Sequence, residues 1–313
     1  MLRGKKIKYH FCLNFILWGL VLLFMGIEAE SGVLFKNDPP GQKKMEMGFK
    51  IKGGRSLFLS NDINTHLKGW LDMWSDDPAI DVSGEFETLK KGIDISGEMF
   101  INFSERFGIS IGAGYIHSGK ESSIENTWGS WISTTFKDTV CPEISAIPLT
   151  LSLHVILPVG SVLDVVFNAG TGYYIGKVEW SYHYKNLGNP SVAYKESWNA
   201  GSNAMGFHGG IALQWNINSQ WAFFIGFKGR YVKLTELTGE YSWEYVTSDY
   251  SDSGEANDYT FWFGDYRYGS EFYSQMLLND TKPSGSLWKN VRKGEVSLSG
   301  FSLIVGIKID FSL

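Results

Sequence analysis

The last thirteen residues, FSLIVGIKIDFSL (301–313), constrain the fold of this chain more than any other stretch. Apolar residues occupy every odd position from Phe301 to Leu313, and the positions between them are small or polar except for Ile304. Alternation with a period of two indicates a β-strand that has one apolar and one polar face. Thirteen residues is long for a strand of a soluble protein. It is enough to cross a membrane, which takes about 9–11 residues. The pattern therefore predicts a membrane-spanning strand.

The same alternation recurs in seven earlier stretches, so the sequence predicts eight strands in all. They cover residues 44–54, 93–104, 107–118, 144–157, 162–184, 204–216, 221–235 and 301–313. Short turns join three pairs of these strands, and long segments join the others, at 55–92, 119–143, 185–203 and 236–295, the last extending as a hairpin. An even number of strands with alternating short and long connections is typical of outer-membrane barrels. The predicted fold is all-β: an eight-stranded antiparallel transmembrane up-and-down β-barrel with long extracellular loops and short periplasmic turns.

The N-terminus has the layout of a secretory signal peptide. Four basic residues at positions 3–8 precede an apolar run over 11–25, and Ala29 follows in a region of small residues. We therefore expect a signal peptide over 1–29, a short periplasmic segment over 30–44 and a barrel domain over 45–313. Removing the signal peptide takes away four bases and one acid, which changes the net charge from −5 to −8. An acidic chain of this kind argues against nucleic acid as a partner.

The predicted lipid-facing positions support a membrane barrel over a soluble β-sandwich or a lipocalin-type barrel. No outward position of any predicted strand is charged, and a Lys or Arg there would cost about 2–4 kcal/mol at mid-bilayer. A soluble sheet usually carries charges on its outer face. Aromatic residues are expected at the membrane interfaces. The positions predicted for these aromatic girdles are Tyr115, Tyr173, Trp215, Trp221 and Tyr231.

Charged residues of both signs are predicted to face the lumen. They are Glu46, Lys50, Lys52, Asp94, Glu98, Asp164, Lys228, Arg230, Lys308 and Asp310. The interior of an eight-stranded barrel is just wide enough for side chains to fill it, and opposite charges in such a confined space must pair. We therefore predict a plugged polar lumen and a structural or surface-interaction role. The alternative is a narrow, porin-like channel for water or ions along the same charges.

Catalysis is the other alternative, as a lipid-modifying hydrolase of the outer membrane. His117, Ser118 and Glu121 lie close in sequence, and Asp76 and Asp77 stand in the first predicted loop. Adjacent strand residues point to opposite faces, so His117 cannot activate Ser118. No catalytic residue is therefore predicted, and the protein is expected not to be an enzyme. The six histidines lack close pairing, so no metal site or other cofactor is expected.

Two stretches of this sequence resemble small outer-membrane barrels of the OmpA/OmpX-like and outer membrane protein β-barrel domain families. They are ISAIPLTLSLHVILPVGSVLDVVFNAGTGYYIGK (144–177) and FSLIVGIKIDFSL, within a resemblance that covers about 45–313. The resemblance implies a monomer in the outer membrane of a bacterium with a two-membrane envelope. Its implied partners are outer-membrane lipid, lipopolysaccharide and the barrel-assembly machinery. Such strands usually end in an aromatic residue, whereas this chain ends in Leu313. An extracellular ligand would bind through the segments 55–92 and 236–295.

Overall fold

The computed structural model describes residues 46–59, 61–129, 134–189 and 192–312. They belong to one contact unit, Lys44–Leu313. The predicted signal peptide, the segment 30–44 and Leu313 lie outside the described residues. Among the described residues, no helix combines the length and apolar character that a membrane crossing requires.

Sixteen strands and one helix make up the described part of the chain. The elements are β1 (Glu46–Phe58), α2 (Asp62–Ser75), β2 (Ile80–Gly84), β3 (Lys91–Asn102), β4 (Phe107–Gly119), β5 (Ser122–Trp128), β6 (Thr134–Pro158), β7 (Leu163–Asn186), β8 (Ala193–Asn216), β9 (Trp221–Tyr231), β10 (Lys233–Leu234), β11 (Thr238–Val246), β12 (Ser251–Tyr268), β13 (Glu271–Asn279), β14 (Trp288–Lys293), β15 (Val296–Ser297) and β16 (Gly300–Ser312). All their pairings are antiparallel. The prediction of an all-β antiparallel fold is confirmed, but the predicted total of eight strands is wrong.

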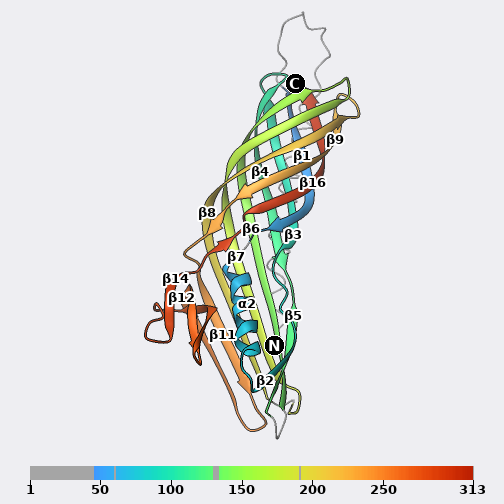
Figure 1. The fold of residues 1–313 in the computed structure, drawn as a ribbon. Coiled ribbons are helices and arrows are strands. Elements are labelled where there is room, and N and C mark those ends of the chain that lie inside the picture. The colour runs from blue at the N-terminus through green and yellow to red at the C-terminus, as the bar shows by residue number, and fades with distance from the viewer. Residues whose placement is uncertain (1–45, 60, 130–133, 190–191, 313) are drawn as a thin grey trace, which may run out of the picture. The chain divides into compact units, whose positions relative to one another are not determined.

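Eight of the strands pair in a continuous path, which we call the strand ring (Figure 1). The path runs β1–β3–β4–β6–β7–β8–β9–β16. β16 then pairs with β1 over Glu46↔Ser312 to Phe58↔Gly300, so every strand of this path has two partners. These are the strands on which the sequence shows apolar and polar alternation. Connections of only a few residues join β3 to β4, β6 to β7 and β8 to β9.

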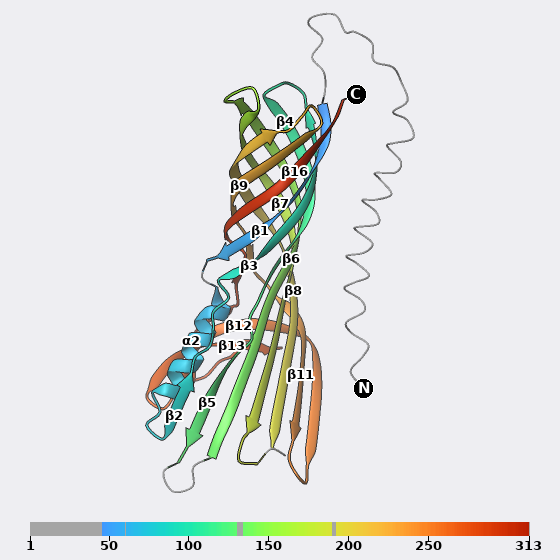
Figure 2. The ribbon, with the colours of Figure 1, turned by 90° about the vertical axis from the view of Figure 1, so that its right-hand side faces the viewer.

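Beyond the ring, β6, β7 and β8 continue as an outer sheet, which we call the extension (Figure 2). These strands are 25, 24 and 24 residues long. β5 pairs with the added part of β6, and β11 pairs with the added part of β8. The predicted loops 119–143 and 185–203 are therefore mostly strand. The segment 236–295 contains the four strands β11, β12, β13 and β14, more than the predicted hairpin.

The predicted loop 55–92 is also corrected, because it contains α2 and β2. The Asn61 side chain caps the helix by accepting a hydrogen bond from the Asn64 backbone N–H at 2.9 Å. Ile63 and Leu67, four residues apart, bury their side chains completely on one helix face. They belong to the same hydrophobic core as Trp180 and Trp198 on the inner face of the extension. The signal for this element is the helical periodicity of apolar residues over 62–75, which differs from the period-two alternation that predicts the strands.

Two neighbouring glycines of β1 provide a test of the β1–β16 pairing. A Cβ on Gly54 would overlap the Leu303 carbonyl oxygen of β16, whereas the nearest atom to a Cβ on Gly53 lies 3.8 Å away. We expect Gly54→Ala to destabilise the ring by about 1–3 kcal/mol through overpacking, and Gly53→Ala to have little effect. The measurement is the folded fraction by heat-modifiable gel mobility. Equal losses in the two variants would mean that β1 does not approach β16 as described.

Candidate functional site

The two faces of the strand ring differ in polarity. Outward positions are mostly apolar and exposed, and the charged exception on β1 is Arg55, exposed between Leu303 and Ile93 beyond the predicted strand 44–54. The apolar ones include Ile51, Ile95, Ile111, Leu149, Leu151, Leu153, Met205, Ile211, Leu213, Phe223, Ile225, Phe227, Leu303, Val305 and Ile307. Inward positions carry most of the buried polar residues, among them Lys52, Asp94, Lys228 and Arg230. The ring therefore exposes its apolar face and buries its polar one, the reverse of a soluble protein.

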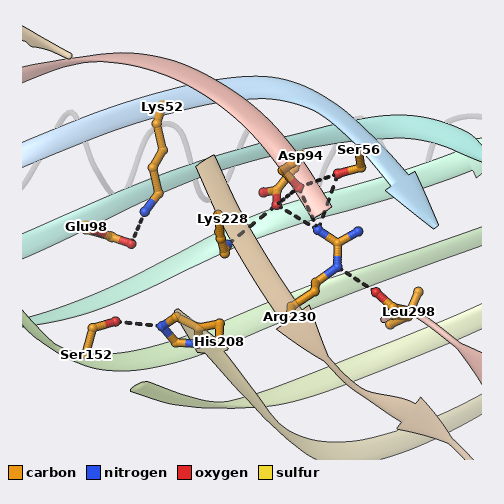
Figure 3. A network of polar contacts seen from close by, with 10 residues as sticks. Lys52, Ser56, Asp94, Glu98, Ser152, His208, Lys228, Arg230 and Leu298 are labelled. Atoms are coloured by element: carbon orange, nitrogen blue, oxygen red, sulfur yellow. Dashed lines mark hydrogen bonds and ion pairs between the residues drawn. The ribbon is translucent and has the colours of Figure 1, made fainter. Parts of the chain in front are cut away.

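Asp94 is the centre of a buried ionic cluster that links four strands (Figure 3). Its Oδ2 lies 3.0 Å from Arg230 Nη1 and 3.5 Å from Lys228 Nζ, both on β9. Arg230 Nη1 also donates to the hydroxyls of Ser302 on β16, at 2.9 Å, and Ser56 on β1, at 3.3 Å. The side chains of Asp94 and Arg230 are only 2% and 0% exposed. One guanidinium thus bridges from β9 across β16 and β1 to Asp94 on β3.

Two further ion pairs lie inside the ring. Lys52 on β1 pairs with Glu98 on β3, and Lys308 Nζ lies 2.9 Å from Asp310 Oδ1 on β16. Nearby, Ser152 Oγ and His208 Nε2 are 2.7 Å apart. All of these groups are buried or half-buried, so the charges are compensated within the protein rather than by bulk water.

Lys50 is placed differently from the other predicted cations. It stands opposite Lys308 in the β1–β16 register and opposite Glu98 in the β1–β3 register. Lys50 Nζ and Lys308 Nζ each lie 5.0 Å from the centroid of the Phe100 ring. A cation at this distance is attracted by the ring's quadrupole. Phe100, buried inside the ring, is a contributor that the sequence reasoning missed.

Two predicted members of the charge network are held by neutral groups instead. Asp164 accepts hydrogen bonds from Gln214 at 3.2 Å and Asn216 at 2.8 Å. Glu46 accepts one from Asn102 at 3.3 Å, and the Asn102 amide oxygen lies 2.6 Å from His154 Nε2. The ten predicted residues comprise five bases and five acids, so the set is neutral as a whole. The structure thus divides it into separate clusters rather than one network.

An apolar layer that was not predicted lies beyond the Asp94 cluster. Val232, Leu234, Leu237, Val296 and Leu298 are completely buried. A Cβ on Gly176 of β7 would overlap the Leu234 side chain, and one on Gly206 of β8 would overlap Val232. Leu234 and Val232 therefore lie against the inner side of the ring strands.

The apolar layer is hydrogen-bonded to the ionic cluster, and a small cavity lies elsewhere in the ring. Arg230 Nε donates to the Leu298 carbonyl oxygen at 2.6 Å. A cavity of about 30 Å³ remains beside Lys50, Lys52, Glu98 and His154, room for one or two water molecules. The sequence contains a signal for this layer, because the inward positions of the predicted strand 221–235 change from charged at Arg230 to apolar at Val232 and Leu234.

The five predicted interface aromatics lie near two levels of the ring. Trp215 and Trp221, 62% and 42% exposed, flank the short connection between β8 and β9. Tyr231 lies at the other end of β9, and Tyr173 pairs with Met205 and Leu149. Tyr115 is half-buried and pairs with Ile95. The apolar exposed residues of the ring lie mainly between these levels.

The extension has an aromatic interior on the face continuous with the inside of the ring. Trp70 of α2 contacts Trp180 and Tyr182 at centroid distances of 6.2 and 4.8 Å, and Trp180 stacks on Trp198 at 5.3 Å. His66 of α2 is buried beside Trp70, and its Nδ1 accepts a hydrogen bond from the Met276 backbone at 3.2 Å. Burial lowers the pKa of His66 to about 3, because the charged imidazolium would be desolvated there.

The residues considered for catalysis have structural partners. Ser118 Oγ donates to the Lys91 carbonyl oxygen at 2.8 Å, and its neighbour His117 lies on the opposite face of β4. Asp76 accepts a hydrogen bond from Tyr273, and Asp77 accepts one from Tyr268, at 3.0 and 2.8 Å. Within the described residues, no group of three or more His, Cys, Asp or Glu side chains is placed to hold a metal ion.

No protein-family model matches the chain, and no curated protein matches it. Among solved structures, it is similar to a major outer membrane protein from Thermus thermophilus, with a TM-score of 0.36, 11% identity and coverage of 85% of this chain and 99% of that one. It is also similar to the outer membrane protein OprG from Pseudomonas aeruginosa, with a TM-score of 0.34, 11% identity and coverage of 88% of this chain and 100% of that one. For the outer membrane protease OmpT from Escherichia coli the TM-score is 0.27 and the identity 12%, with coverage of 88% of this chain and 99% of that one. TM-scores below 0.5 do not establish relationship or function, and membership of the OmpA/OmpX-like family is not confirmed.

Replacing Asp94 tests whether its carboxylate compensates the buried cations. Asp94→Asn leaves Arg230 and Lys228 without their counter-ion, and we expect it to cost about 3–5 kcal/mol of unfolding free energy. Asp164→Asn is the matched control, since Asp164 is bonded to neutral amides and its loss should cost about 1 kcal/mol. Urea unfolding in lipid vesicles measures both. Similar losses in the two variants would contradict the ionic cluster.

The buried His66 predicts an acid sensitivity of the extension. Its folded pKa lies below the unfolded value of about 6.5, so the unfolded chain binds the extra proton first. Stability attributable to His66 is therefore complete above about pH 6.5 and decreases as the pH falls towards the folded pKa, by about 1.4 kcal/mol per pH unit.

His66→Gln isolates this contribution, because glutamine retains an acceptor for the Met276 N–H but does not titrate. Urea unfolding followed by tryptophan fluorescence at about pH 7 and pH 4.5 should show the wild type losing about 2.5 kcal/mol more than the variant. Parallel pH profiles of the two proteins would show that His66 is not held neutral.

Proposed function

We propose that the strand ring is a transmembrane β-barrel of the outer membrane of a bacterium with a two-membrane envelope, and that its lumen is plugged. Its role is structural or surface-interacting rather than catalytic. The observation that carries the proposal is the filling of the ring by compensated charges and a completely buried apolar layer. The cavity beside Lys50 and Glu98 has a volume of about 30 Å³, room for one or two water molecules, which supports a plugged lumen.

The outward face of the ring supports the membrane location. Large apolar side chains on its eight strands are about half exposed, for example Leu153 at 63%, Ile111 at 58% and Leu303 at 58%. Soluble proteins rarely expose continuous apolar patches above a few hundred Å². In a bilayer the same surface is buried in hydrocarbon. The pairings of each ring strand with two neighbours also satisfy the backbone groups that lipid cannot.

The separation of the two aromatic levels fits the thickness of an outer membrane. Trp221 and Tyr231 are ten residues apart on β9, or about 33 Å along the strand at about 3.3 Å per residue. Strands of such barrels tilt by about 35–45°, which reduces this length to about 25 Å along the membrane normal. An apolar band of about 25 Å is what outer-membrane barrels have.

The two ends of the ring support one orientation of the proposed barrel in the membrane. The short connections 103–106, 159–162 and 217–220 lie at the same end as the start of β1 and the end of β16. In outer-membrane barrels the short turns face the periplasm. The extension then projects from the outer surface of the cell, where its half-buried aromatic residues are available to other molecules. This placement favours a surface-interaction role over a purely structural one.

Conductance measurements test the plug. In planar bilayers the purified protein should give no discrete openings, because ions cannot pass the Asp94 cluster and the apolar layer. Discrete openings that disappear on substitution of Lys228 and Arg230 would contradict the plugged lumen and support the channel. Heat-modifiable gel mobility of each variant is the control for folding.

A further inference from the structure

The inner face of the extension carries a group of tyrosines and two carboxylates that the plugged ring does not use. We call Tyr182, Tyr184, Tyr194 and Tyr241, with Asp138 and Glu196, the tyrosine face. The strand registers bring the group together, because Tyr184 stands opposite Tyr194, and Tyr182 opposite Glu196. All four tyrosines are half-buried. The face comes from β6, β7, β8 and β11, and Trp70 of α2 covers it at Tyr182, at a centroid distance of 4.8 Å.

Hydrogen bonds fix both carboxylates among the tyrosine hydroxyls. Glu196 accepts a hydrogen bond from Tyr194 at 2.9 Å, and the Tyr194 and Tyr241 hydroxyls are 3.1 Å apart. Asp138 accepts hydrogen bonds from Tyr182 and Asn126. These donors are neutral, and burial raises the pKa of both Asp138 and Glu196. Glu196 is half-buried and Asp138 is only 2% exposed, and no Lys or Arg pairs with either of them within the described residues, whereas Asp94 and Glu98 of the ring each pair with a cation.

The bases of the same strands lie on the other face. Lys137, Lys185 and Lys195 occupy odd positions of β6, β7 and β8, and odd positions of these strands face outward. Among the described residues of β6, β7 and β8 in the extension, the inner face has two acids and no lysine or arginine. The exposed acids of the adjoining hairpin lie on the outer face instead: Glu244 pairs with Lys195 at 3.6 Å, and Glu255 stands opposite Ser242, which faces Ser197. The charge of this region is thus complementary to a cation.

We infer that the tyrosine face binds a cationic side chain, an ammonium or guanidinium group presented by a Lys- or Arg-rich peptide. Tyrosine rings attract a cation over their faces, and Glu196, the half-buried carboxylate, forms a charge-assisted hydrogen bond with it, while the buried Asp138 adds negative charge behind the rings. Tyrosine also gives a large contact area at low conformational cost. A neutral saccharide would use the rings but would leave both carboxylates uncompensated. The inference deepens the surface-interaction role proposed above, on which it rests, by naming the class of partner.

Binding of a short Arg/Gly peptide to the purified full-length chain in detergent tests the inference. Isothermal titration calorimetry at about 0.15 M salt reduces the long-range contribution of net charge. We expect Glu196→Gln to weaken binding about tenfold, through loss of a charge-assisted contact. The matched control is Glu255→Gln, which removes the same charge from the exposed hairpin, where Glu255 stands opposite Ser242. It should change the affinity by less than about twofold, as expected for an exposed charge.

Three outcomes would overturn the inference. They are no peptide binding, equal weakening by both substitutions, and binding of a neutral oligosaccharide in preference to the peptide. Asp138→Asn is the second variant if Glu196→Gln fails to give the folded band in gel mobility. The conductance test reports only on the ring, so a conducting protein that binds the peptide would contradict the plug alone. A protein that shows no conductance and does not bind the peptide would contradict this inference alone.

Discussion

The antiparallel pairing of β1 with β16 is the constraint on which the rest of the fold depends. It joins the first and last described strands, so that Ser56 and Ser302, 246 residues apart in sequence, lie 2.7 Å apart at their hydroxyls. Without it, both strands would present unpaired backbone groups, which lipid cannot satisfy. Arg230 reinforces the same junction from inside, since it contacts Ser302, Ser56 and Asp94 in turn. The polar interior is therefore part of what holds the ring together.

Individual strands are apolar on the outward face within the ring and apolar on the inward face in the extension. On β6 the outward residues Leu149 and Leu151 are apolar and exposed, whereas further out the inward residues Val140 and Ile144 are apolar and buried. The same reversal occurs on β7, where Tyr173 is exposed and Trp180 is buried. The physical reason follows from the proposed membrane location. Lipid requires an apolar outer face, while water requires an apolar inner one.

This reversal explains how far the sequence could predict the fold. The ring strands were found because their lipid-facing residues form long apolar and polar alternations, as in 301–313. The continuations of β6 and β8 were predicted as loops, because on β6 the apolar residues move to the other parity near Ile144 and Ile147 and interrupt the alternation, whereas the predicted strand 162–184 covers nearly all of β7. Helix α2 was missed because its apolar spacing is helical. The inward charges were identified by parity, but which acid meets which base depends on strand stagger, and side-chain reach let Arg230 bond Asp94 three strands away.

The contrast between the two sets of buried acids separates the roles of the ring and the extension. In the ring, Asp94 and Glu98 each have a cation at ion-pair distance. Within the described residues, Asp138 and Glu196 in the extension have only neutral donors. In the proposed membrane location an uncompensated charge surrounded by lipid would cost several kcal/mol, which accounts for the ion pairs of Asp94 and Glu98. Asp164, beside the short connection at the start of β7, accepts hydrogen bonds from neutral amides instead. At the end of the extension Glu196 is half-buried, so water limits that cost and the carboxylate needs no cation of the protein's own. The proposed surface interaction therefore fits the extension better than the ring.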